Sequence, residues 1–154
     1  MKKISAVLIF ILYTLTLQAQ HLEREDGIYY DKDNNLYTGT YAEHYESGQI
    51  KIEMQIKSGL KHGVIKMFFK NGQIKEIRAY YNNLMDGTWQ TWNENEIKIG
   101  EANYSKGLKN GKWRIWDENG ILRYDMNYDN GKKIGIWYIY DESGKLISSK
   151  NYNE

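Results

Sequence analysis

The sequence has no cysteine and no proline among its 154 residues. Without cysteine the chain can form no disulfide, no thiolate metal site, no cysteine nucleophile and no lipid-modified cysteine. Phenylalanine is scarce, with 3 residues, whereas 14 tyrosines and 5 tryptophans supply most of the aromatic content. Tyr and Trp have an apolar body and a polar tip, which suits a half-exposed sheet better than an enclosed core.

The chain also lacks a strong charge bias, with a formal net charge of +1. Residues 21–50 carry 2 basic and 7 acidic side chains, residues 51–85 carry 7 and 2, and residues 86–154 carry 10 and 11. The near balance argues against a nucleic-acid partner. The basic stretch could meet phosphate or an acidic partner, or be an ordinary solvated surface, and both readings remain open.

The first residues have the layout of a secretory signal peptide. Lys2 and Lys3 form a positive start, residues 4–17 are largely apolar, and Ala19 offers a small residue for cleavage before Gln20. The apolar run of about 14 residues is short for a membrane span, which needs about 20. An uncleaved anchor helix is the alternative. We therefore expect residues 1–20 to be removed and the mature protein to be periplasmic or extracellular.

Most of the remaining chain is an internal repeat of 24 residues, marked by Gly39, Gly63, Gly87, Gly111 and Gly135. Two residues after each glycine stand Tyr41, Ile65, Trp89, Trp113 and Trp137, and five residues after it stand His44, Phe68, Trp92, Trp116 and Tyr140. Seventeen residues after it stand Ile56, Tyr80, Tyr104, Tyr128 and Tyr152. The fixed period predicts a repeat architecture for residues 39–154, with five copies of one unit.

Each copy predicts a β-hairpin. A first strand, such as TWQTW, leads into a tight turn such as Asn71-Gly72 or Ser143-Gly144, where glycine supplies the positive φ that hairpin turns need. A second strand ends near the tyrosine position, and another glycine turn begins the next copy. Because short turns join antiparallel strands, we expect an all-β fold: an elongated, single-layer antiparallel β-meander of stacked hairpins.

Two segments depart from the repeat. Glu96 stands where the other copies have the turn glycine, and Ile97 and Ile99 are out of step with the apolar residues of the other copies, so we expect a bulge or an altered turn near Asn95–Ile99. Residues 21–38 form an N-terminal tail and half-unit. We expect residues 21–26 to be disordered and the half-unit 27–38 to cap the array.

The pattern Gly-x-Trp-x-x-Trp/Tyr-x-x-Asn/Ser-Gly, then Tyr, then Gly-x-x-x-Gly, resembles the MORN repeat, and more closely its bacterial variant, labelled YwqK-type antitoxin-like. Leu36-Tyr37-Thr38-Gly39 also looks like the start of that group. The resemblance covers about residues 27–154. It implies stacked hairpins in a single-layer sheet and a protein-binding, lipid-binding or scaffolding role, and it carries over no catalytic residue. An antitoxin acts on a cytoplasmic toxin, so an exported chain implies either an exported partner or a label without function here.

The aromatic residues are the candidate binding site. We expect Trp89, Trp113 and Trp137 to form one ladder about 10 Å apart, because each unit adds two strands, and Trp92, Trp116 and Tyr140 to form a second. The rings either serve only as the core of the sheet or also line a groove that holds a ligand. The full candidate set is Tyr41, Trp89, Trp92, Trp113, Trp116, Trp137 and Tyr140.

Catalytic and metal-binding patterns are lacking. The three histidines, His21, His44 and His62, have no partner at metal-ligand spacing, and the acidic pairs Asp117-Glu118 and Asp141-Glu142 stand beside turns. We therefore expect neither an enzyme nor a cofactor.

The leading expectation is an exported module that holds a protein partner through its sheet face or edges. The alternatives are an envelope component that binds glycan or lipid, and an immunity protein for an exported toxin. The oligomeric state stays open.

Overall fold

The computed structural model describes residues 23–25 and 27–153, and in these residues it contains thirteen strands and no helix. In chain order the strands are β1 (Glu23–Glu25), β2 (Ile28–Tyr30), β3 (Gly39–His44), β4 (Ile50–Lys57), β5 (Leu60–Phe68), β6 (Ile74–Tyr81), β7 (Leu84–Met85), β8 (Gly87–Trp92), β9 (Lys98–Ser105), β10 (Leu108–Trp116), β11 (Leu122–Asp129), β12 (Lys132–Tyr140) and β13 (Leu146–Asn151). The predicted all-β class is confirmed. The signal-peptide prediction for residues 1–20 falls outside the described residues.

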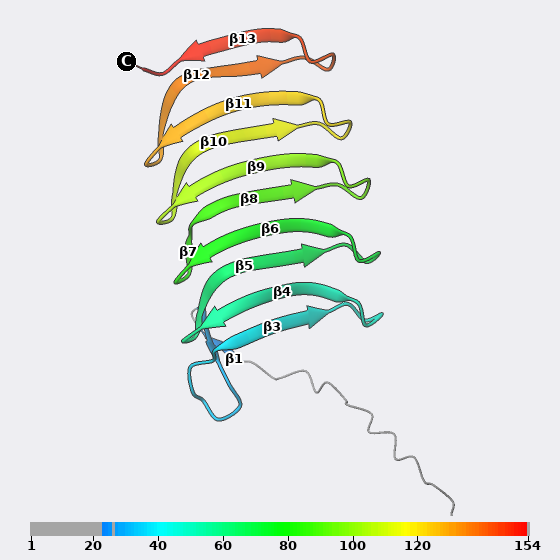
Figure 1. Cartoon of the computed structure of the whole chain (residues 1–154), viewed down its shortest axis with the longest axis vertical. Helices are drawn as coiled ribbons and strands as arrows, with labels where there is room; N and C mark the ends of the chain where they lie inside the picture. Colours follow the sequence, from blue (N-terminus) through cyan, green and yellow to red (C-terminus); the bar gives the residue numbers. More distant parts are fainter. Residues whose placement is uncertain (1–22, 26, 154) are drawn as a thin grey trace, which may run out of the picture.

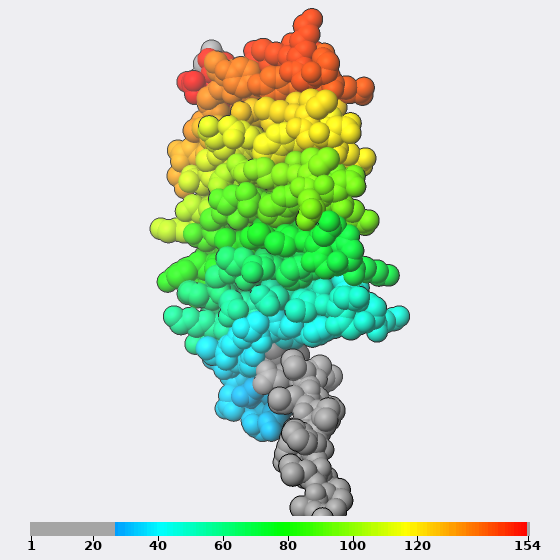
Figure 2. Space-filling model, turned by 45° about the vertical axis from the view of Figure 1, so that its right-hand side comes forward, coloured from blue at the N-terminus to red at the C-terminus, as the bar shows by residue number. Residues whose placement is uncertain are grey.

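Eleven strands form one antiparallel sheet in the order β13-β12-β11-β10-β9-β8-β6-β5-β4-β3, and the short β7 also pairs with β6. Figure 1 shows the hairpins stacked in chain order, with the first and last strands at opposite ends of an open sheet. Figure 2 shows the same stack as successive layers of an elongated molecule. The predicted single-layer meander of hairpins is therefore the observed architecture.

Each hairpin keeps the same register. The repeat glycine lies opposite the residue seventeen positions later, as in Gly63 with Tyr80 and Gly87 with Tyr104. Near the inner turn every hairpin has a register shift, for example between Ile115 and Trp116, where the second strand carries one extra residue. This bulge belongs to the repeat itself, because all five hairpins show it.

Of the bulge or altered turn expected near Asn95–Ile99, the bulge is present, with Ile99 as the extra residue between Lys98 and Gly100, but every hairpin shares it, and the turn itself is not altered. Glu96 takes a φ of 60°, and its N–H donates to the carbonyl of Asn93 at 3.1 Å, as the N–H of Gly120 donates to Asp117 at 3.0 Å. The Asn93 N–H also donates to Ile97 O, the bond that closes the other inner turns. The five-fold stack fixes this turn geometry, so glutamate adopts the backbone that glycine would adopt without strain.

Successive repeats are joined through their outer turns. The N–H of Gly59 donates to Tyr37 O at 2.7 Å, and that of Gly107 donates to Met85 O at 2.8 Å. Side chains just before the repeat glycines add a second bond: Thr38, Asp86 and Asn110 accept from backbone N–H groups twenty residues later. At the same position His62 instead forms a hydrogen bond with the Asn82 side chain at 3.0 Å, so this histidine also joins two successive repeats.

The N-terminal segment covers the first repeats. β1 pairs with β2, so the expected disorder of residues 21–26 was wrong for residues 23–25. Tyr29 is 3% exposed and packs with Met54, Ile56 and Ile65, which form the main buried cluster. In the other repeats the positions of Ile56 and Ile65 are mostly Tyr and Trp. Tyr29 therefore fills the space that these smaller side chains leave.

Candidate functional site

The seven candidate aromatic residues do not share one surface. β8 runs without a bulge of its own, so its side chains alternate and Trp89 and Trp92, three residues apart, point to opposite faces. The same holds for Trp113 and Trp116, and for Trp137 and Tyr140. We call the side of Trp89, Trp113 and Trp137 the ladder face, and the side of Trp92, Trp116 and Tyr140 the band face.

On the ladder face the expected row of tryptophans is present, with a tyrosine between each pair. The aromatic ladder runs Tyr80, Trp89, Tyr104, Trp113, Tyr128, Trp137 and Tyr152. Neighbouring ring centroids are 4.8–5.4 Å apart and the rings are tilted by 44–67°. Cross-strand aromatic pairs of this kind contribute about 0.2–1 kcal/mol each beyond area burial.

The ladder tryptophans use their polar atoms inside the fold. The indole N–H groups of Trp89, Trp113 and Trp137 donate to backbone carbonyls of the neighbouring strand at 2.9–3.0 Å. Burial also raises the pKa values of the Tyr104 and Tyr128 hydroxyls. These contacts assign the ladder to the stability of the sheet.

Lysines lie over one side of the ladder. The Lys109 ammonium lies 4.2 Å from the Trp113 ring centroid, and that of Lys133 lies 4.6 Å from Trp137. Tyr41 stands outside this continuous ladder, because its ring contacts Tyr29 at 5.7 Å. It belongs to the N-terminal buried cluster rather than to the tryptophan row.

On the band face of the described residues no ring contact joins one hairpin to the next, although Tyr138 and Tyr140 of β12 have ring centroids 6.5 Å apart. In each hairpin the aromatic residue at the end of the first strand lies opposite a long side chain at the start of the second. We call this row of pairs the aromatic band. Its pairs are Phe68 with Ile74, Trp92 with Lys98, Trp116 with Leu122, and Tyr140 with Leu146. Lys98 takes the place of the aliphatic residue in the third copy, and its ammonium lies 4.8 Å from the Trp116 ring centroid. The band is partly open to solvent, with Ile74 38% and Leu146 48% exposed.

The band tryptophans differ from the ladder tryptophans in one chemical respect. In the part of the chain that the structure describes, no hydrogen bond joins the indole N–H of Trp92 or Trp116 to another protein group, whereas all three ladder indoles are bonded. A Trp that keeps its N–H free beside apolar neighbours can hold a ligand by ring contact and by a hydrogen bond at once.

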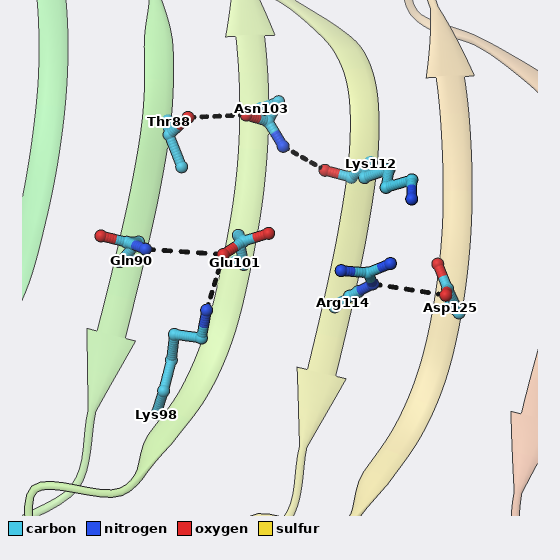
Figure 3. A network of polar contacts seen from close by, with 8 residues as sticks. All are labelled: Thr88, Gln90, Lys98, Glu101, Asn103, Lys112, Arg114 and Asp125. Atoms are coloured by element: carbon cyan, nitrogen blue, oxygen red, sulfur yellow. Dashed lines mark hydrogen bonds and ion pairs between the residues drawn. The ribbon is translucent and has the colours of Figure 1, made fainter.

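A row of polar contacts runs beside the band (Figure 3). Glu101 accepts hydrogen bonds from Lys98 at 2.7 Å and from Gln90 at 3.5 Å, and Arg114 pairs with Asp125 at 3.3 Å. The Lys98 ammonium holds the pKa of the Glu101 carboxyl below its usual range. The band face thus combines aromatic rings with charges of both signs, which suits a polar partner surface.

The basic stretch 51–85 has much of its charge engaged within the fold. Lys51 pairs with Glu43 at 3.7 Å, Arg78 lies 4.9 Å from the Trp89 ring centroid, and Lys75 lies 5.8 Å from that of Phe69. A shallow hollow beside the first inner turn is lined by His44, Tyr45, Glu46, Ser47, Lys51 and Lys70. Its charges are mixed, so it does not select for phosphate.

Residues 27–153 hold no group of three or more side chains suited to a metal ion. In the same residues no helix has the length and apolar character of a membrane span. Sequence reasoning missed the polar row, because its members occupy two strands of each repeat and do not share one residue type. The signal that was available is register: Gln90, Glu101, Arg114 and Asp125 are mutually opposite once the hairpins are aligned.

Comparison with known families gives one match. The family described as MORN repeat variant matches residues 37–58, 61–83, 109–130 and 133–154, more than half of the chain. The unmatched stretch between the second and third matches contains β8 and β9, which keep the common hairpin pairing although Glu96 and Lys98 depart from the residues of the other copies. No curated protein shows significant similarity to the chain.

Proposed function

Because the chain belongs to the MORN repeat variant family, we propose that it is an exported, non-enzymatic module that binds a protein partner along the aromatic band. Repeats of this family commonly serve as protein- or membrane-binding modules. The observation that carries the proposal is the difference between the two tryptophan rows. The ladder indoles donate their N–H groups to backbone carbonyls, whereas within the described residues the indole N–H groups of Trp92 and Trp116 donate to no protein group.

The surroundings of the band support a protein partner. Exposed Ile74 and Leu146 and the rings of Trp92 and Trp116 offer apolar contact, and the adjacent Glu101 row offers paired charges. Tryptophan beside satisfied polar groups is the composition enriched at protein-binding hot spots. A partner lying across the strands would meet the same contacts once per hairpin, about every 10 Å.

The test compares capture of partners by three forms of the tagged mature protein in its native cells, after crosslinking and mass spectrometry. Trp92→Ala/Trp116→Ala should stay folded and recover at least tenfold less of a near-stoichiometric protein. Trp92→Phe/Trp116→Phe isolates the N–H groups and should show an intermediate loss. Ile115→Ala/Ile139→Ala, on the opposite face, is the matched control and should capture as the wild type does. Equal recovery by all forms would rule out the band.

A glycan or lipid of the envelope is the second candidate. Indole rings suit sugars, and at the outer turns exposed Leu84 lies beside Gly107, next to exposed Leu108 and to Lys109 in the chain. Recovery of wall or membrane material alone would favour this role. An immunity role against an exported toxin is the finer form of the protein-binding proposal. The identity of a captured protein would separate it from scaffolding.

Export is part of the proposal and has its own test. Residues 1–20 have the charge and apolar layout of a signal peptide. N-terminal sequencing of the protein recovered outside the cytoplasm should begin near Gln20 or His21. A mature protein that retains Met1 or fractionates with the cytoplasm would contradict export.

A further inference from the structure

Three lysines on the ladder face lie over aromatic rings and pair with no carboxylate. Lys109 and Lys133 lie opposite ladder tyrosines, and Lys150 lies opposite Trp137, so all three share the ladder face. Their ammonium groups lie 4.2–5.2 Å from ladder ring centroids. Among the described residues no ion pair joins any of them to a carboxylate. We call these three residues the ladder lysines. The rings hold them in place without neutralising their charge.

The strands around the ladder lysines place their carboxylates on the other face. The acidic residues of β8–β13 are Glu101, Asp125 and Asp129. Each is next in the chain to a ladder-face residue, so its side chain lies on the band face. The ladder-face carboxylates of β3 and β6, in contrast, are paired with cations of the fold. The ladder face of β8–β13 is therefore basic, and a matching surface has to be acidic.

An open apolar row runs beside the ladder lysines on the same face. Ile115, Tyr124 and Ile139 lie opposite one another on β10, β11 and β12, and they are 44%, 41% and 37% exposed. We call these three residues the apolar row. The residues of β9 opposite Lys109 and Ile115 are four positions apart, so about 13 Å of strand separates the lysines from the apolar row. A partner of this face needs an apolar side flanked by acidic groups.

The repeat sets a spacing that a helix matches and an extended chain does not. Lys109 and Lys133 are two strands apart, about 10 Å across the sheet, and so are Ile115 and Ile139. Side chains on one side of an extended chain recur about every 7 Å. A helix presents the same side again after seven residues, or about 10.5 Å. A helix lying across the strands can therefore place one acidic residue at each lysine and apolar residues along the isoleucines.

We propose that the ladder face of β9–β13 binds an acidic amphipathic helix of a partner protein, laid across the strands. Carboxylates on one flank of this helix pair with the ladder lysines, and its apolar stripe covers the apolar row. The buried cluster around Tyr29 lies on β4 and β5, so the N-terminal segment leaves the apolar row exposed. The inference goes beyond the proposed function, because it gives the opposite face of the sheet a second partner.

The test uses a defined probe, a fluorescein-labelled peptide of about 21 residues in three heptads. It has leucine at positions a and d, glutamate at position e, and alanine or glutamine elsewhere. Fluorescence anisotropy measures its binding to the purified mature chain, and circular dichroism follows its helicity. The wild type should bind the peptide as a helix, more weakly as salt is added, and should bind a version with glutamine at position e at least tenfold more weakly.

Variants of the two faces locate the contact. Lys109→Glu/Lys133→Glu should lose at least tenfold in affinity for the glutamate peptide. Lys66→Glu/Lys112→Glu, the same change of charge on the band face, is the matched control and should bind as the wild type does. A peptide with lysine at position e should bind Lys109→Glu/Lys133→Glu more tightly than it binds the control, which has the same net charge. An unfolded variant would not show this preference.

The proposal and the band proposal fail separately. Trp92→Ala/Trp116→Ala should bind the glutamate peptide as the wild type does. Ile115→Ala/Ile139→Ala should bind it more weakly and still capture the partner of the aromatic band. Loss of one interaction therefore leaves the other standing.

Four results would overturn the proposal. The first is no binding of the glutamate peptide, and the second is binding that is unaffected by its change to glutamine or by Lys109→Glu/Lys133→Glu. The third is binding of phosphatidylglycerol vesicles through the same lysines in place of the peptide, which would assign the face to a lipid surface. The fourth is a dimer in sedimentation velocity that Lys109→Glu/Lys133→Glu changes, which would assign the face to a second copy.

Discussion

At the scale of single residues, the inner turns all require a positive φ, which glycine adopts easily and other residues do not. Four turns have glycine at φ of 80–89°, and the third has Glu96 at 60°. A left-handed backbone costs an L-residue about 1–2 kcal/mol, and glycine recovers part of this while it adds entropy to the unfolded chain. The backbone of Glu96 is therefore strained, and the packing of the neighbouring hairpins offsets the energetic cost.

Glu96→Gly should stabilise the protein by about 0.5–1 kcal/mol and raise the thermal midpoint by about 3 °C per kcal/mol. Differential scanning calorimetry measures the change. Glu94→Gly, in the same turn but without a positive φ, is the matched control and should be neutral or destabilising. A lower midpoint for Glu96→Gly would show that the Glu96 side chain has a contact worth more than the strain.

The buried Tyr128 and the half-buried Tyr104 of the ladder predict how stability depends on pH. Burial raises the pKa values of Tyr104 and Tyr128 above the ordinary value of 10.0, so the unfolded chain loses these protons first as pH rises. Their contribution to the free energy of unfolding is complete below pH 10 and is lost above it. Urea unfolding at pH 8 and pH 11 should show this loss. Tyr128→Phe should lose less stability between these pH values than the wild type, and Tyr124→Phe, which changes an exposed ring, should behave as the wild type does.

At the scale of elements, the N-terminal segment acts as part of the first two hairpins. Tyr29 donates its backbone N–H to Gly59 O at 2.9 Å and packs its ring against Tyr41. Its ring packs among Met54, Ile56 and Ile65 and fills the space that the Tyr and Trp rings of the aromatic ladder fill in later repeats. The segment is therefore held by both main-chain bonds and a filled core position.

Tyr29→Ala should destabilise the first hairpins by about 3 kcal/mol, because it removes a large ring from a site that is only 3% exposed. Hydrogen exchange should lose protection in β3–β5 while β10–β12 keep theirs, since repeat arrays unfold by neighbouring units. Tyr30→Ala, at the more exposed neighbouring position, should have a smaller effect. Uniform loss of protection along the sheet would mean that the stack unfolds as one unit.

At the scale of the whole molecule, the constant register makes the repeats exchangeable. Every hairpin pairs with the same offsets, and the outer turns repeat the same carbonyl contacts. The stability of such an array is approximately the sum of the unit stabilities and of the contacts between neighbours. Removal of one unit should shorten the stack without changing its faces.

Deletion of the 24 residues Gly87–Asn110 joins Asp86 to Gly111 and should give a folded, shorter protein with a somewhat lower thermal midpoint. Deletion of one residue fewer, Gly87–Lys109, leaves the strand out of step and turns its core side chains toward the opposite face. Circular dichroism and tryptophan fluorescence should show a cooperative transition for the first variant and loss of fixed packing for the second. Equal melting of the two would contradict a register fixed by the repeat.

The sequence alone determined the hairpins, their number and their stacking, because the glycine spacing of 24 fixes where each turn lies and each strand has a single way to pair with its neighbour. It also determined the row of Trp89, Trp113 and Trp137, which follows from the same period. Only the tertiary structure decided which indoles are bonded, how Tyr29 fills a space far along the chain, and that Glu96 accepts the turn of glycine. These features depend on contacts between strands and on packing of the whole stack, and no local pattern encodes them. The separation of the two tryptophan rows onto opposite faces lies between these cases. The spacing of three residues between Trp89 and Trp92 predicts opposite faces for a regular strand. The structure adds that β8 has no bulge between them, so the side chains do alternate.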